Sequence, residues 1–136
     1  MLLRFVPRVL AGLLVTLVVL LTGCSPSGPS GATGAGSSAP SWARGMATIS
    51  RSGLPAEARQ TLDLIDRGGP FPYRQDNTVF GNFEGRLPKE PRGYYHEYTV
   101  RTPGSRDRGA RRIVTGQGGE FYYTDDHYNT FRAVLR

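Results

Sequence analysis

The sequence has 136 residues and a formal net charge of +6, with 17 Lys and Arg against 11 Asp and Glu. A single cysteine, Cys24, excludes an internal disulfide, and the basic excess favours a polyanionic partner such as nucleic acid. The segment that is able to fold is short enough for one domain only.

Residues 1–23 have the features of an export signal. Arg4 and Arg8 form the positive region, and Val9 to Leu21 is an uncharged run of thirteen residues. A membrane-spanning helix needs about 20 residues, so cleavage is favoured over a permanent anchor. The four residues "LTGC" resemble the lipobox of bacterial lipoproteins, which implies a lipoprotein-type signal peptide and a lipidated Cys24. An ordinary signal peptide with an incidental cysteine is the alternative.

Residues 24–45 are expected to form a tether. Ser25 to Ser41 contains only Ser, Pro, Gly, Ala and Thr, a composition that buries little and stays disordered. We therefore expect residues 46–136 to form the folded domain. The protein is expected outside the cell, either held to the outer face of the membrane by its lipid or secreted.

The folded part begins with a short strand at Met46 to Ser50 and a helix in "LPAEARQTLDLIDRGGP". Pro55 suits a first helical turn, and Gly68 and Gly69 end the helix. One apolar stripe follows from the spacing of Leu54, Ala58, Leu62 and Ile65. The sequence predicts a single amphipathic helix of about thirteen residues.

From Gly69 onward, turn residues separate short strand-like segments. The predicted strands are "TVFGNFEG" with two interrupting glycines, Tyr94 to Arg101, Arg111 to Thr115, Phe121 to Thr124 and "FRAVL". A helix followed by such strands predicts an α+β fold, in which the helix packs on one face of a small, twisted antiparallel sheet.

The strand around Glu97 places a carboxylate beside an arginine-rich segment. Successive strand residues point to opposite faces, so Glu97 and His96 diverge. If this strand and Arg111–Thr115 form a hairpin in which the numbers of facing residues have an odd sum, Glu97 and Arg112 share a face, and Arg108 reaches in from the loop. A solvated cross-strand ion pair is the simpler interpretation of this feature alone.

His127 favours a catalytic interpretation over a simple ion pair, because this histidine follows a predicted strand in "YYTDDHYNTF". A base, an acid and guanidinium groups are what cleavage of RNA through its 2′-hydroxyl requires without a metal. Zinc binding by His96 and His127 is poorly supported, because no third ligand stands at a recognisable spacing.

Six motifs occur in the order of a known family: "LPAEARQTLDLI", "GPFPY", "VFGNFEG", "GYYHEYTV", "RGARRIVTG" and "YYTDDHY". The chain resembles the secreted guanyl-specific ribonucleases of bacteria, and most closely the smaller relatives of barnase. The resemblance implies single-stranded RNA as substrate, cleavage 3′ of guanosine through a 2′,3′-cyclic phosphate, a monomer, and no metal or cofactor.

The resemblance also implies roles for individual residues. Glu97 would be the general base and His127 the general acid, with Arg108 and Arg112 binding the phosphate. Tyr128 would be a further contact near the phosphate. The guanine-binding loop would be "FGNFEG": a Phe80 wall, backbone amides around Asn82 and Phe83, and the Glu84 carboxylate on the N1–H and N2–H₂ edge.

Three points separate this chain from that family. Relatives often carry arginine in place of Phe83, so guanine preference is expected to soften. They also join the N-terminal strand to the C-terminus by a disulfide, whereas Ser50 stands near one of those positions here, so we expect lower stability. A lipobox is unusual in the family. Two alternatives remain open: a surface lipoprotein that binds RNA or an acidic partner without turnover, and an interbacterial toxin with a barstar-like inhibitor.

Overall fold

The computed structural model describes residues 39–136, so the predicted signal peptide and Cys24 lie outside the described residues. Its elements are one α-helix, two short 3-10 turns and six strands. In chain order they are η2 Ser41–Ala43, β1 Thr48–Ser50, η3 Arg51–Gly53, α1 Ala56–Arg67, β2 Thr78–Phe80, β3 Tyr95–Thr99, β4 Arg112–Gly116, β5 Phe121–Thr124 and β6 Arg132–Leu135. Across the described residues, no helix has the length and apolar character needed to cross a membrane.

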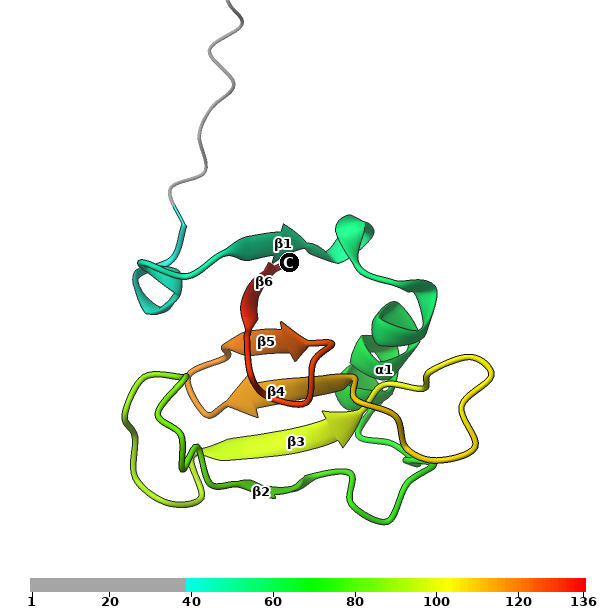
Figure 1. The fold of residues 1–136 in the computed structure, drawn as a ribbon. Coiled ribbons are helices and arrows are strands. Elements are labelled where there is room, and N and C mark those ends of the chain that lie inside the picture. Colours follow the sequence, from blue (N-terminus) through cyan, green and yellow to red (C-terminus); the bar gives the residue numbers. More distant parts are fainter. Residues whose placement is uncertain (1–38) are drawn as a thin grey trace, which may run out of the picture. The chain divides into compact units, whose positions relative to one another are not determined.

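The six strands form one sheet in the order β1-β6-β5-β4-β3-β2 (Figure 1). Neighbours from β2 to β6 pair antiparallel, and β1 pairs parallel with β6. The sheet is therefore mixed rather than wholly antiparallel. The chain passes from β1 into α1 before it enters the antiparallel meander, and β6 returns alongside β1 only at the end.

Helix α1 covers one face of the sheet, which confirms the α+β prediction. The helix ends at Arg67 and is capped by Gly68, which adopts φ 74°, a left-handed conformation that glycine takes without steric cost. Three residues of the apolar stripe, Leu54, Ala58 and Leu62, are each at most 2% exposed, and the fourth, Ile65, is partly buried against them. They form a core with sheet residues that include Tyr98 and Ile113.

The opposite face of the sheet is covered by loops and by the N-terminal turn. Its apolar cluster consists of Ala43, Leu87, Tyr95, Val114, Tyr122, Phe131 and Ala133. Ala43 is 1% exposed, and Trp42 packs edge-on against Tyr122 with ring centroids 5.4 Å apart. The packed part of the chain thus begins before Met46, because these apolar side chains interrupt the tether composition and find partners on the sheet.

The predicted segment 78–85 is a strand only as far as Phe80. Asn82 adopts φ 50°, and the Gly85 amide donates to its carbonyl at 3.0 Å. This turn takes the chain away from β3 and produces a loop over the second face of the sheet.

Candidate active site

The β3–β4 hairpin places three polar side chains on the sheet face opposite α1. Glu97 faces Val114 and Thr99 faces Arg112, so facing residue numbers add up to 211. This odd sum meets the condition under which Glu97 and Arg112 lie on the same face. Glu97, Thr99 and Arg112 therefore share a face, while His96 points to the other, where its Nδ1 lies 2.9 Å from Asn77 Oδ1.

Both carboxylate oxygens of Glu97 are held by neighbouring side chains. Arg108 Nη2 donates to Oε1 at 3.2 Å, and the Tyr128 hydroxyl donates to Oε2 at 2.6 Å. The Glu97 side chain is 15% exposed, so the carboxylate is reachable from solvent but fixed in orientation. Arg108 reaches it from the loop between β3 and β4, as expected.

The two arginines are fixed by other groups of the site. The Thr99 hydroxyl accepts from Arg108 Nε at 3.0 Å and from Nη2 at 2.9 Å. Arg112, only 3% exposed, donates through Nη1 to the carbonyls of Gly109 and Arg111 and through Nε to the Tyr128 hydroxyl at 3.1 Å.

One terminal nitrogen of each guanidinium is not used in a hydrogen bond. Arg108 Nη1 and Arg112 Nη2 make no hydrogen bond within the part of the chain that the structure describes. A guanidinium presents five donors in a rigid fork that matches phosphate oxygens. The unused nitrogens beside Glu97 can therefore donate to an anion that enters the site.

Tyr128 connects the carboxylate to the arginine. Burial, together with its hydrogen bond to Glu97, raises the pKa of Tyr128 to about 12. The hydroxyl consequently stays protonated at neutral pH and acts as a donor to the carboxylate while accepting from Arg112.

His127 lies in the loop between β5 and β6, next to this group. Both His127 and Tyr128 have left-handed backbones, with φ 57° and 70°. Asp126 stabilises the turn: its carboxylate accepts from the Thr130 amide at 2.9 Å, from the Thr130 hydroxyl at 2.6 Å and from the Thr124 hydroxyl at 2.9 Å. The His127 amide donates to the Ala110 carbonyl at 3.1 Å, and its exposed ring lies 5.0 Å from the Tyr128 ring.

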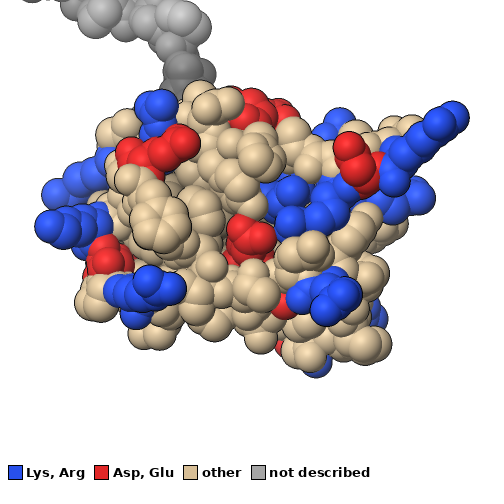
Figure 2. All heavy atoms as spheres, turned by 60° about the horizontal axis from the view of Figure 1, so that its bottom comes forward, with Lys and Arg blue, Asp and Glu red and all other residues tan. Residues whose placement is uncertain are grey.

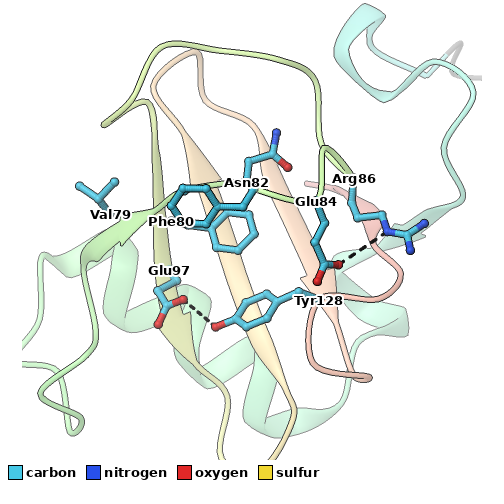
Figure 3. A pocket seen from close by; sticks show the side chains of 9 residues that line it. Val79, Phe80, Asn82, Glu84, Arg86, Glu97 and Tyr128 are labelled. Atoms are coloured by element: carbon cyan, nitrogen blue, oxygen red, sulfur yellow. Dashed lines mark hydrogen bonds and ion pairs between the residues drawn. The ribbon is translucent and has the colours of Figure 1, made fainter.

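The loop after β2 is held in shape by the Asn82 side chain. Asn82 Nδ2 donates to the Leu87 carbonyl at 2.9 Å, and the Leu87 amide donates to Oδ1 at 3.1 Å. Asn82 therefore points away from the pocket in Figure 3, whereas Glu84 points into it. The backbone amides of residues 82–84 find no acceptor among residues 39–136.

A pocket of about 300 Å³ lies between this loop and the side chains of Glu97 and Tyr128. Glu97 lies on one side and Glu84 on the other, with Phe80 and Tyr128 between them (Figure 3). The rings of Phe80 and Tyr128 are stacked with centroids 5.0 Å apart. Every residue predicted to bind or cleave the substrate thus lies in the pocket or beside it.

Phe83 is the most exposed large apolar residue of the described chain, at 91%. Its ring lies over Gly81, where a Cβ would collide with the ring in this conformation. Phe83 therefore lines the mouth of the pocket without entering the core.

Two contributions were not expected from the sequence, namely that of Thr99 to the position of Arg108 and that of Asp126 to the shape of its own loop. Thr99 stands two residues after Glu97 on the same strand face, so alternation alone could have placed it beside the arginine. Asp126 stands in "TDDHY", and a carboxylate that caps its own loop is a known turn signal. Within residues 39–136, no three His, Cys, Asp or Glu side chains are grouped to hold a metal ion.

The surface around the site has mixed charge. Figure 2 shows an acidic group in a hollow of largely uncharged surface, with a cluster of basic side chains beside it and further basic groups around the rim. The basic groups on such a surface attract an anion.

Comparison with known proteins agrees with this geometry. Residues 37–135 match the family model described as ribonuclease. Guanyl-specific ribonuclease St of Saccharopolyspora erythraea is 55% identical over 91 residues, which cover 67% of this chain and 90% of that protein. Guanyl-specific ribonuclease Sa3 of Kitasatospora aureofaciens is 61% identical over 92 residues, covering 67% of this chain and 65% of that protein.

A solved structure gives the same result. Ribonuclease Sa2 with guanosine-2′-cyclophosphate has a TM-score of 0.64 and 53% sequence identity, covering 66% of this chain and 96% of that chain. The match to the family model, the shared fold and the extent of sequence identity together establish that the chain belongs to the family of microbial guanyl-specific ribonucleases.

Proposed function

We propose that the protein is an endoribonuclease that cleaves single-stranded RNA on the 3′ side of guanosine, with Glu97 and His127 as its acid–base pair. One observation carries this assignment. A fixed carboxylate, two arginines with unused donors and a loop histidine meet at one side of a pocket that has a second carboxylate, Glu84, on its other side.

In the first step, Glu97 removes the proton of the 2′-hydroxyl, whose oxygen attacks the adjacent phosphorus. The bond from phosphorus to the 5′ oxygen breaks, and His127 gives that oxygen its proton. The products are a 2′,3′-cyclic phosphate and a free 5′-hydroxyl. In the second step the roles are exchanged: His127 removes a proton from water, the water oxygen attacks phosphorus, and Glu97 protonates the departing 2′ oxygen.

Arg108 and Arg112 stabilise the charge that grows on the phosphate oxygens. Their free nitrogens, Arg108 Nη1 and Arg112 Nη2, are the donors available for this contact. Because Thr99, Tyr128 and backbone carbonyls already fix both guanidiniums, little reorganisation is needed when the transition state forms. Tyr128 lies near the phosphate and stays protonated, and its single hydroxyl proton is donated to Glu97, which orients the base.

The loop after β2 selects guanine. Glu84 accepts hydrogen bonds from N1–H and N2–H₂, and the free backbone amides at Asn82 and Phe83 donate to O6 and N7. Among the RNA bases, only guanine offers this pair of donors beside acceptors. The Phe80 ring forms a wall for the base. Phe83 is an aromatic ring at the place where relatives often carry a charge, and it supports a softened guanine preference.

The decisive experiment digests a short RNA of mixed sequence with residues 39–136 in the presence of EDTA and maps the ends. We expect 2′,3′-cyclic phosphate and 3′-phosphate ends after guanosine. The Glu84→Gln variant, which replaces one acceptor by a donor, should lose the guanine preference while still cutting RNA. Uniform cleavage by the parent protein would contradict the specificity, and dependence on a divalent metal would contradict the mechanism.

The chemistry also argues against a role in binding alone, since none of the four acid–base and phosphate-binding residues is replaced. We further propose that the protein is exported and anchored through a lipidated Cys24, acting as a monomer. Replacing Cys24 with Ala should move the protein from the membrane fraction into the medium. A barstar-like acidic protein is the expected inhibitor, and its partner surface would be the same basic site.

A further inference from the structure

A second groove adjoins the guanine pocket on the side away from Glu97. It has a volume of about 510 Å³, within the range of about 300–1,000 Å³ that is typical of small-ligand sites. Arg86 lines both cavities, so they lie next to each other on the two sides of this residue. The other side of the groove is built by the N-terminal turn, with Trp42 and Arg44, and by Asn129 and Thr130, which follow the loop of His127.

The lining of this groove suits a nucleotide. The Trp42 indole is half-buried and is fixed by its edge-on packing against Tyr122, so it forms a ready aromatic wall. Arg44 is exposed and makes no side-chain hydrogen bond or ion pair within residues 39–136, which leaves its guanidinium available to a phosphate. Bases stack on aromatic rings, and arginine binds the backbone, without regard to sequence.

We propose that this groove, the Trp42 groove, binds the nucleotide on the 5′ side of the guanosine that is cleaved. The inference rests on the proposed function. There the 3′ phosphate lies by Glu97, Arg108 and Arg112, so the RNA that continues in the 3′ direction leaves past that side. Figure 3 shows Arg86 on the opposite side of the pocket from Glu97, and the Trp42 groove begins there. The 5′ chain enters this groove, with its base against Trp42 and its phosphate near Arg44.

The test compares GpC, which has no 5′ nucleotide, with ApGpC. We expect kcat/KM to be at least about fivefold higher for ApGpC, because stacking of one base on an aromatic side chain has an effect of about that size or larger. Trp42→Leu and Arg44→Ala should each reduce this ratio toward one. In Arg44→Ala, the dependence of log kcat/KM on log salt should also become shallower by about 0.7 for ApGpC, which is the effect of one lost phosphate contact to a single strand.

Arg67→Ala is the matched control, since Arg67 is an exposed arginine at the far end of α1. It removes the same charge and should leave both the ratio and the salt dependence unchanged. Thermal unfolding shows whether Trp42→Leu is folded. If this variant is unfolded, Arg44→Ala alone tests the proposal. A parental ratio near one, or a ratio that both variants retain, would overturn the groove as a subsite. GpCpA carries its extra nucleotide on the 3′ side. If the two variants reduced an advantage of GpCpA over GpC instead, the assignment of the groove to the 5′ side would be overturned. Failure of the parent protein to cleave GpC would overturn the proposed function itself.

Discussion

The two faces of the β3–β4 hairpin are formed by the same two strands but differ in what they contribute to the protein. Toward α1, Tyr98 and Ile113 are buried in apolar contact with Leu62. On the other face, Glu97 and Arg112 are held by hydrogen bonds to Arg108, Tyr128 and backbone carbonyls. One face stabilises the fold and the other holds charged groups at a fixed distance. Substitutions on the two faces should therefore separate stability from activity.

The largest effects are expected from the acid–base pair. Glu97→Gln and His127→Ala should each lower kcat/KM for GpC by about 10²–10⁴-fold, because each removes one proton-transfer group. His96→Ala is the control, since His96 is the neighbour of Glu97 on the opposite face. Steady-state kinetics at pH 7 measure the difference. Parental rates in both catalytic variants would show that the acid and base are other groups.

Substitutions on the face toward α1 should lower stability and leave activity unchanged. Leu62 is fully buried, and Leu62→Ala should lower the free energy of unfolding by about 2–5 kcal/mol through lost apolar contact and a cavity. The folded fraction should keep its kcat/KM. Gln60→Ala, an exposed position on the same helix, should change stability little. Urea denaturation measures both variants, and a stable Leu62→Ala protein of low activity would mean that the two faces are coupled.

Thr99 is a positioning residue on the catalytic face. Thr99→Val removes the acceptor of two hydrogen bonds from Arg108, while the β-branched shape is kept. Hydrogen bonds to charged groups contribute about 1.5–3 kcal/mol, so we expect kcat/KM to fall by about tenfold or more. Thr99→Ser should restore most of the activity, because it returns the hydroxyl. If Ser and Val behave alike, the effect is one of packing rather than of Arg108 orientation.

The loop that presents His127 should respond to acid. Hydrogen bonds from Thr130, with a further one from Thr124, lower the pKa of Asp126 from 3.8 to about 2. A lowered pKa means that the folded state favours the carboxylate. The stabilisation by Asp126 is therefore complete above the unfolded value of 3.8 and is lost as the pH falls toward 2. Unfolding measured from pH 5 to pH 2 should show a shallower decline in Asp126→Asn than in the parent.

Much of this arrangement followed from the sequence. Alternation on one strand separated Glu97 from His96, and the helical spacing placed Leu62 in the core. The remaining features depend on contacts across the fold. The loop shape around Asn82 results from its side-chain bonds to Leu87, and a propensity for strand or turn does not encode such a partner.

The pairing at the edge of the sheet could not be predicted from the local sequence either. The parallel pairing of β1 with β6 joins Ile49 to Val134, which are 85 positions apart in the sequence. Each segment is short, and local pattern gives neither its partner nor its direction. The start of the packed part of the chain shows the same limit. Trp42 and Ala43 pack in the second apolar cluster, and the sequence of their own segment does not reveal this contact.

The smallest effect is expected where the resemblance implied a disulfide, near Ser50 and the C-terminus. Here Arg136 pairs with Asp66 of α1, and Arg51 lies 3.7 Å from the same carboxylate. The hydrogen bond from Arg136 is the main cause that lowers the pKa of Asp66, so this stabilisation is present above the ordinary value of 3.8 and is lost as the pH falls below it.

These charges are partly exposed, so Asp66→Asn should cost at most about 1 kcal/mol at pH 7 and less in 1 M salt. A double-mutant cycle with Arg136→Ala isolates the pair, and Glu90→Gln, at an exposed position, is the control. A disulfide in a small secreted domain contributes about 2–5 kcal/mol, which a pair of this kind does not replace. The urea midpoint should therefore lie below that of a disulfide-containing relative. An equal midpoint, together with a coupling energy near zero, would place the missing stability in the apolar packing of the two sheet faces.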